Sequence, residues 1–195
     1  ITLRAILSII TALFISLILS PYIIKKFSVN NVSEVIRDDG PSSHINKTGT
    51  PTMGGLLILS SLIITTLLWA DLENKYILYL LFITISFGVI GFIDDYKKLT
   101  KSKKGMSAKS KIISQIFVAG ILSVVMFNNI DSLAEQQFII PIFKHIIIDL
   151  GIFFIPLTIL VIISTSNAVN LTDGLDGLAI MPIVLVSGAL GIFAY

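Results

Sequence analysis

Long apolar stretches separated by short polar segments dominate this sequence. Six of them approach the roughly 20 residues that a helix needs to cross the hydrocarbon core of a bilayer. They cover residues 3–24, 52–70, 76–93, 111–127, 145–166 and 177–195. Helices are expected because lipid cannot satisfy an open strand edge, and because the runs lack the alternation of a membrane barrel. The predicted fold is an all-α bundle of about six transmembrane helices, forming one integral membrane domain over residues 1–195.

Two prolines and one polar connector interrupt this pattern. Pro156 and Pro182 lie inside the last two apolar runs, where proline removes a helical hydrogen bond and bends or breaks a helix. The longest segment between runs on the side opposite the motif loops, 128–144, is polar from Asp131 to Gln137. It is predicted to be a plain connector, with room for a short hairpin or interfacial turn.

Positive charge is distributed unevenly between the two sides of the predicted bundle. If all six runs cross, the segments 25–51, 94–110 and 167–176 share one compartment. With the boundary residue Lys111, they hold all the lysines and arginines except Arg4, Lys75 and Lys144. The positive-inside rule then places these segments in the cytoplasm and the N-terminus outside.

Composition agrees with a membrane protein and excludes several other classes. Hydrophobic residues make up 54% of the chain and charged residues 13%, with a mean hydropathy of +0.93. The formal net charge of +2 is too small to suggest nucleic-acid binding. Cysteine is absent from the sequence, which excludes disulfides, iron–sulfur clusters and thiolate catalysis.

An acidic pair, Asp94–Asp95, closes the third apolar run. Carboxylates at a bilayer edge are costly unless a cation uses them, and adjacent carboxylates repel each other unless a cation relieves the pair. Helix C-termini also disfavour negative charge. The alternative is a pair of solvated loop charges balanced by Lys97 and Lys98. The position of the pair favours a functional site.

A second polar motif, Asn-Ala-Val-Asn-Leu-Thr-Asp-Gly-Leu-Asp-Gly-Leu at 167–178, separates the last two runs. Its carboxylates, carboxamides and hydroxyl are oxygen ligands of the type that Mg²⁺ prefers. In a helix, Asn170, Asp173 and Asp176 would share one face because they are three residues apart. Capping of two helix ends is the alternative, although a cap needs only one such residue.

Two further segments add candidate phosphate contacts. Gly-Thr-Pro-Thr-Met-Gly-Gly at 49–55 leads directly into an apolar run, and free N–H groups at a helix start favour phosphate. Lys47 could add positive charge there, or could simply follow the positive-inside rule. Lys111 begins the fourth run, where it would stay near the membrane plane and could meet a pyrophosphate. The other lysines of 97–111 are explained by topology and by attraction to anionic lipids.

Three motifs, at 49–55, 91–96 (Gly-Phe-Ile-Asp-Asp-Tyr) and 167–178, occur in this order along the chain. Together they resemble the bacterial phospho-N-acetylmuramoyl-pentapeptide transferases, within the wider polyprenyl-phosphate N-acetylhexosamine-1-phosphate transferase superfamily. The resemblance implies a multi-pass enzyme of the bacterial cytoplasmic membrane. Such an enzyme transfers phospho-N-acetylmuramoyl-pentapeptide from its UDP-linked donor to undecaprenyl phosphate, giving lipid I and UMP with Mg²⁺.

The resemblance also implies roles for individual residues. Asp94 and Asp95 would lie at the catalytic centre, with one or both handling the lipid phosphate. The remaining six residues would bind the substrates. Lys47, Thr52 and Lys111 would line a polar groove, and Asn170, Asp173 and Asp176 would line the nucleotide and metal side. Of these, Asp173 and Asp176 are the candidate Mg²⁺ ligands. A covalent aspartyl intermediate and direct attack by the lipid phosphate both remain open, and direct attack is favoured.

One departure from the family pattern limits this interpretation. Family members are longer, and their later part supplies a third catalytic aspartate and a histidine-rich loop that this chain does not contain. The chain is therefore expected to be an N-terminal part that is inactive alone, with a homodimer as one option for its assembly. Two rivals remain: a related UDP-N-acetylglucosamine transferase, and a cation-coupled transporter, whose carboxylates should lie nearer mid-helix.

Overall fold

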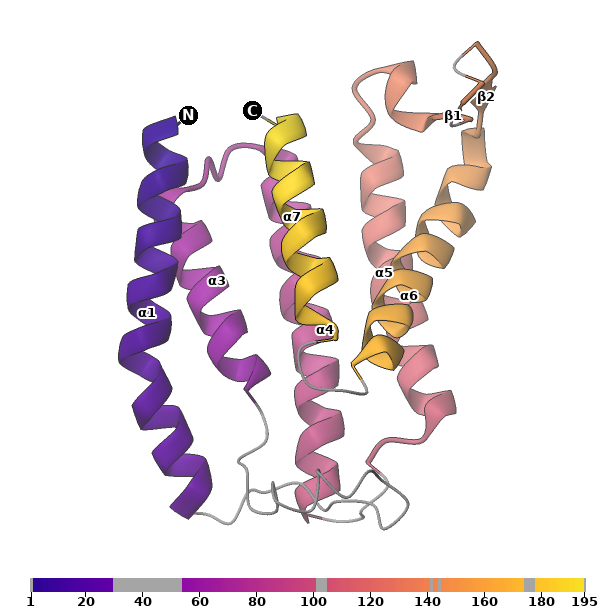
Figure 1. Cartoon of the computed structure of the whole chain (residues 1–195). Coiled ribbons are helices and arrows are strands. Elements are labelled where there is room, and N and C mark those ends of the chain that lie inside the picture. The colour runs from indigo at the N-terminus through magenta and orange to yellow at the C-terminus, as the bar shows by residue number, and fades with distance from the viewer. Residues whose placement is uncertain are drawn as a thin grey trace. The chain divides into compact units, whose positions relative to one another are not determined.

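The computed structural model describes residues 2–29, 54–100, 105–140, 142–143, 145–173 and 178–194. Its elements (Figure 1) are mainly helices. The α-helices are α1 (Thr2–Val29), α3 (Gly55–Trp69), α4 (Lys75–Thr100), α5 (Ala108–Asn128), α6 (Phe154–Thr172) and α7 (Ile180–Ala194). Two short 3₁₀-helices, η1 (Leu133–Gln136) and η2 (Gly151–Phe153), and two strands, β1 (Gln137–Ile139) and β2 (Ile147–Asp149), complete the described chain.

Four helical segments within the described residues are long and apolar enough to cross a membrane: Leu3–Lys26, Lys75–Leu99, Ala108–Asn128 and Gly151–Thr172. This confirms the predicted fold class, a helical membrane bundle. The helices α3 and α7 are apolar but have only 15 residues each, which gives each a length of about 22 Å. The hydrocarbon core is about 30 Å thick, so full crossings by α3 and α7 stay a prediction.

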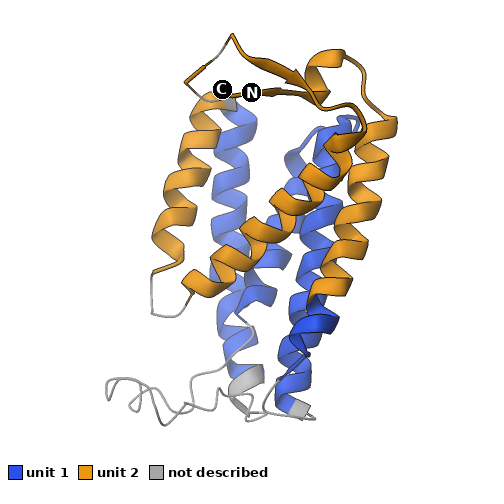
Figure 2. Ribbon diagram, turned by 90° about the vertical axis from the view of Figure 1, so that its right-hand side faces the viewer, with its two compact units in different colours: residues 1–111 blue, residues 112–195 orange. Residues whose placement is uncertain are grey.

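The chain forms two compact units, residues 1–111 and 112–195 (Figure 2). In the first unit, α1 and α3 pack through small polar side chains. The Ser16 hydroxyl donates to the Ser61 hydroxyl at 3.1 Å, and Ser61 donates to the Ala12 carbonyl at 3.0 Å. Near the end of α3, the Trp69 indole N–H donates to the Thr11 hydroxyl at 3.0 Å. Small residues allow close helix approach, and such hydrogen bonds stabilise it where water is absent.

A glycine sets the approach of α3 to α4 within the same unit. A Cβ at Gly88 would lie 2.6 Å from Leu59 Cδ1, so any larger residue would require the Leu59 side chain on α3 to shift. The connection between the two helices is short, and Asn74 caps α4 by accepting a hydrogen bond from the Tyr76 N–H at 2.9 Å. The two helices are therefore antiparallel neighbours, with the start of α3 beside the end of α4.

In the second unit, α5 and α6 are joined by a polar contact. The Asn167 side-chain amide donates to Gln115 Oε1 at 2.8 Å and also to the Ile163 carbonyl of its own helix. Gln115 is buried, so a partner for its amide is needed to offset the cost of burial. The rings of Phe127 and Phe154 pack at the other end of this pair in a tilted arrangement, with an interplanar angle of 34° and centroids 6.4 Å apart.

The expected helix over 145–166 is wrong for its first nine residues. Strand β2 pairs antiparallel with β1, with Phe138 opposite Ile148, and helix α6 begins only at Phe154. The β-branched run Ile146–Ile148 favours a strand, and Gly151 then adopts a positive φ of 47° that interrupts a helix. The connector 128–144 therefore holds the first strand of a hairpin, the option left open beside a plain link.

Both prolines mark helix starts rather than bends. Pro156 is the third residue of α6, and Pro182 is the third residue of α7. Proline is tolerated in the first turn because its missing N–H has no partner there in any case. The two prolines thus lie where their helices begin, two residues after the first helical residue, and Pro21 is accommodated inside α1.

Candidate active site

The acidic pair Asp94–Asp95 lies on α4, more than one turn before the helix ends at Thr100. The expectation that the pair ends its helix is therefore wrong. The apolar run ends at Ile93, but the backbone hydrogen bonds continue into the polar segment. The last turn carries Lys97 and Lys98, the charge that a helix C-terminus favours. The carboxylates thus have a rigid helical backbone instead of a loop.

Asp94 is buried and surrounded by hydrogen-bond donors. Its Oδ1 accepts from the Met106 backbone N–H at 2.7 Å. Its Oδ2 lies 3.2 Å from Lys98 Nζ and 3.7 Å from Lys111 Nζ. A buried carboxylate needs such partners because an unpaired buried charge is strongly destabilising. The structure therefore joins the end of α4 to the start of α5 through this one side chain.

The turn before α5 is shaped to reach Asp94. Gly105 has a φ of +67°, and a Cβ there would lie 2.5 Å from Asp94 Oδ1 and 2.8 Å from Lys98 Cγ. Two features favour glycine at this position: the left-handed backbone conformation, and the lack of space for a Cβ beside Asp94 and Lys98. The backbone then presents the Met106 N–H to the carboxylate.

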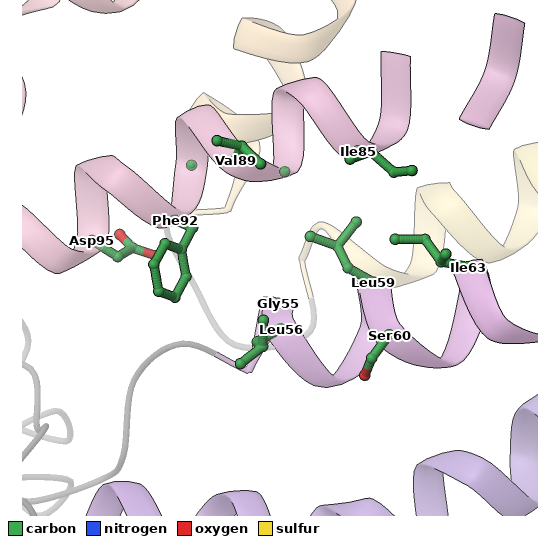
Figure 3. A pocket seen from close by; sticks show the side chains of 11 residues that line it. Gly55, Leu56, Leu59, Ser60, Ile63, Ile85, Val89, Phe92 and Asp95 are labelled. Atoms are coloured by element: carbon green, nitrogen blue, oxygen red, sulfur yellow. The ribbon is translucent and has the colours of Figure 1, made fainter. Parts of the chain in front are cut away.

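Asp95 has different surroundings. Its Oδ1 lies 3.0 Å from Lys98 Nζ, and its side chain lines an apolar groove of about 470 Å³ between α3 and α4. Figure 3 shows Asp95 and Phe92 at the end of the groove where α3 begins, with Ile63 and Ile85 toward the other end. Asp95 is thus the acidic member of a mostly apolar lining, which also includes Ser60.

The second motif lies at the end of α6 in the other unit. The helix ends at Thr172, and the Asp173 backbone N–H still donates to the Val169 carbonyl at 3.1 Å. Asn170 and Asp173 are both exposed, whereas Asn167 is used in the contact with Gln115. Among the described residues, no lysine or arginine forms an ion pair with Asp173.

The predicted site residues divide into three groups. The structure brings Asp94, Asp95 and Lys111 together in the first unit, and it places Asn170 and Asp173 at the end of α6 in the second. Lys47, Thr52 and Asp176 lie outside the described residues. That the two acidic regions form one site stays a prediction. Lys111 pairs with Asp94, whereas the neighbouring lysine of the same turn, Lys109, is exposed.

Sequence reasoning missed two members of the first cluster. The sequence explains Lys98 by topology and by attraction to anionic lipids, yet its ammonium contacts both carboxylates. The signal was present in the spacing, because residues three and four apart meet on a helix face. Gly105 carried no such signal, since its role depends on a contact with α4 that no local pattern reveals.

The oxygen chemistry of these residues suits Mg²⁺, but the described residues do not complete a site. No group of three or more histidine, cysteine, aspartate or glutamate side chains that could hold a metal occurs among them. Both Asp94 and Asp95 already face lysine ammonium groups. Asp173 is the remaining described carboxylate of the motifs, and its predicted partner Asp176 is outside the described residues.

Helices that are long and apolar enough to cross a membrane, with carboxylates and lysines near the end of one of them, suit a membrane protein that binds phosphate groups. A family model described as glycosyl transferase family 4 matches residues 77–195, more than half of the chain. The chain belongs to this family, and it is a multi-pass membrane phospho-sugar transferase with a lipid-linked substrate. A narrower match, phospho-N-acetylmuramoyl-pentapeptide-transferase signature 1, covers residues 47–59. The resemblance to that family is thereby confirmed.

Proposed function

We propose that this protein transfers phospho-N-acetylmuramoyl-pentapeptide from its UDP-linked donor to undecaprenyl phosphate, forming lipid I and UMP at the bacterial cytoplasmic membrane. The observation that carries the proposal is the signature match at 47–59 in a chain of the glycosyl transferase 4 family. The cluster of Asp94, Asp95, Lys98 and Lys111 supports it, because phosphoryl transfer depends mainly on positioning and on neutralising oxygen charge.

In the proposed reaction, an oxygen of undecaprenyl phosphate attacks the phosphorus that is joined to the sugar. A new P–O–P bond forms, the P–O bond to the UMP moiety breaks, and UMP leaves with the bridging oxygen. The prenyl chain keeps the acceptor phosphate at the membrane surface. A carboxylate near the end of a span and two lysine ammonium groups are suited to meeting it there, the lysines by offsetting phosphate charge.

Mg²⁺ dependence is part of this proposal. Asp173 and Asp176 are the candidate ligands, with Asn170 beside them at the end of α6. When bound, Mg²⁺ would neutralise pyrophosphate charge on the donor. Lys47 and Thr52 lie within the signature match and are proposed to contact the substrate phosphates.

A transfer assay tests the proposal. The full-length protein that carries this sequence is purified and given labelled UDP-N-acetylmuramoyl-pentapeptide or labelled UDP-N-acetylglucosamine, with and without undecaprenyl phosphate. We expect label to enter the lipid, and UMP to appear, only with the muramoyl donor and only when the acceptor is present. If label were transferred only from UDP-N-acetylglucosamine, the donor would be UDP-N-acetylglucosamine and the proposed muramoyl donor would be wrong. No acceptor-dependent UMP release with either donor would contradict the proposal.

A further inference from the structure

The two adjacent carboxylates of α4 differ sharply in exposure. The Asp94 side chain is 11% exposed and the Asp95 side chain is 44% exposed. Neighbours in sequence point in different directions around a helix, so one faces the turn before α5 and the other faces the groove between α3 and α4. The difference in exposure suggests that the two carboxylates have different roles.

Both oxygens of Asp94 are already engaged within the protein. The Met106 N–H holds Oδ1, and two ammonium groups, of Lys98 and Lys111, lie against Oδ2. A phosphate could not approach this carboxylate without repulsion, and a metal ion would have to displace two positive charges from a buried site. Asp94 is therefore suited to holding other groups in place.

The Gly105 turn is matched to this contact. Its left-handed φ and its lack of a Cβ together let the backbone pass against Asp94 Oδ1. Strained or glycine-only backbone is kept where the surrounding structure requires it. Here it brings one N–H to Asp94, and Lys111 follows within the first turn of α5.

Asp95 keeps an accessible side. Only its Oδ1 contacts Lys98, and Oδ2 has no hydrogen-bond or ion-pair partner within the described residues. The side chain lies at the end of the groove (Figure 3), where a ligand could reach it. Lys98 contacts both carboxylates, so an ordered Asp94 also fixes the cation beside Asp95.

We propose that Asp94 is a positioning residue. It is held by the Gly105–Met106 turn and in turn holds Lys98 and Lys111, whereas Asp95 is the carboxylate of the pair that meets the substrate. The second half of this statement rests on the proposed transferase function, and the first half concerns structure alone. The two halves are therefore tested by separate readouts.

Lysine reactivity tests the positioning role without any assay of catalysis. The full-length protein is treated briefly with an amine-acylating reagent, and modification at Lys98 and Lys111 is measured by mass spectrometry. We expect Asp94→Asn and Gly105→Ala to increase modification of Lys111 several-fold, and Asp95→Asn to leave it unchanged. Gly188→Ala is the matched control, because a Cβ there meets nothing within 4 Å. Unchanged Lys111 reactivity in Asp94→Asn would overturn the positioning role, even if Gly105→Ala fails to fold.

Kinetics of paired substitutions test the division of roles. The carboxamide oxygen of Asp94→Asn can still accept a hydrogen bond from the Met106 N–H, whereas Asp94→Ala loses this contact. We therefore expect kcat of Asp94→Asn to be at least about ten-fold higher than kcat of Asp94→Ala. At Asp95, where the charge itself is needed, Asn and Ala should be equally impaired. The reverse pattern would assign the substrate-facing role to Asp94 and overturn the inference. If neither position affects transfer, the proposed function of this site fails while the lysine result still stands.

Discussion

The acidic residues of α4 and those at the end of α6 illustrate two ways in which a protein places a carboxylate. Asp94 is buried, and lysines and a backbone N–H satisfy it before any ligand arrives. Asp173 is exposed at a helix end, and no described lysine or arginine pairs with it. The contacts of Asp94 hold neighbouring parts of the protein together, whereas the charge of Asp173 is not offset by any described cationic side chain. We propose that the second arrangement, at Asp173, receives a cation together with its substrate.

This difference supports a division of labour. The carboxylates of α4 already have lysine ammonium groups of α4 and α5 beside them, and we propose that this region receives the phosphate of the lipid. The end of α6 combines Asn170 and Asp173 with no described counter-charge, which suits a nucleotide that brings a divalent cation. Each prediction below tests whether the two regions serve one reaction and whether they differ as described.

The largest expected effect is an all-or-none difference in cysteine labelling from the two faces of the membrane. Residues 1–195 contain no cysteine, so each introduced cysteine is the only one in this part of the protein. We expect Ser102→Cys and Thr172→Cys to react with an impermeant maleimide only from the cytoplasmic face of membrane vesicles, and Asn129→Cys only from the opposite face. Labelling of positions 102 and 172 from different faces would show that the two regions cannot form one site.

Removal of the exposed carboxylate should have the next largest effect. We expect Asp173→Asn to lower kcat/KM for transfer by about 100-fold, the loss typical of removing one group that stabilises charge in a transition state. Asp149→Asn is the matched control, because Asp149 lies in the hairpin and accepts only the Gly151 N–H at 3.1 Å among its described contacts. Steady-state rates over a Mg²⁺ titration measure both variants. Equal activity of the two would remove Asp173 from the site.

Substitutions at the two lysines in the first turn of α5, Lys109 and Lys111, should differ from each other by a smaller factor. Lys111→Met removes an ammonium group that faces Asp94 at 3.7 Å, and we expect about a ten-fold loss of kcat, equivalent to about 1.4 kcal/mol in the barrier. Lys109→Met removes an exposed lysine two residues earlier. It should keep nearly the rate of the natural protein in the same assay. A larger loss at Lys109 would reverse the choice between them.

The smallest effect concerns helix packing beside the second motif. The contact between Asn167 and Gln115 should contribute about 0.6 kcal/mol, the average for polar contacts between membrane helices. A double-mutant cycle with Asn167→Leu and Gln115→Leu, measured by reversible unfolding in mixed micelles, gives the coupling energy. A coupling near zero would mean that Asn167 is not held by this contact and is available to the site.

The sequence predicts most of the fold because the apolar runs themselves specify helices in lipid. Four long segments lie close to where the hydrophobic pattern places them, and Pro156 and Pro182 lie where their helices begin. The hairpin was harder to predict, because Ile146–Ile148 is as apolar as a membrane helix and only its pairing with Phe138 and Ile139 makes it a strand. A hydrophobicity pattern does not distinguish these outcomes for short runs.

The acidic residues of the candidate site could be predicted from the sequence, but their burial and contacts could not. Asp94 and Asp95 were identified from their position at the edge of an apolar run, and Lys111 from its place at the start of the next. Their unequal burial was not predictable, since it depends on the Gly105 turn folding back onto α4. Contacts between segments that are distant in sequence set the role of each acid, and neither composition nor spacing contains them.

Nucleotide binding tests the central division most directly. Equilibrium dissociation constants for UMP in the presence of Mg²⁺ are measured by calorimetry for the natural full-length protein, Asp95→Asn and Asp173→Asn. We expect Asp173→Asn to weaken UMP binding by about ten-fold or more, a change of about 1.4 kcal/mol, and Asp95→Asn to bind UMP as the natural protein does. Weaker binding in Asp95→Asn with unchanged binding in Asp173→Asn would contradict this division.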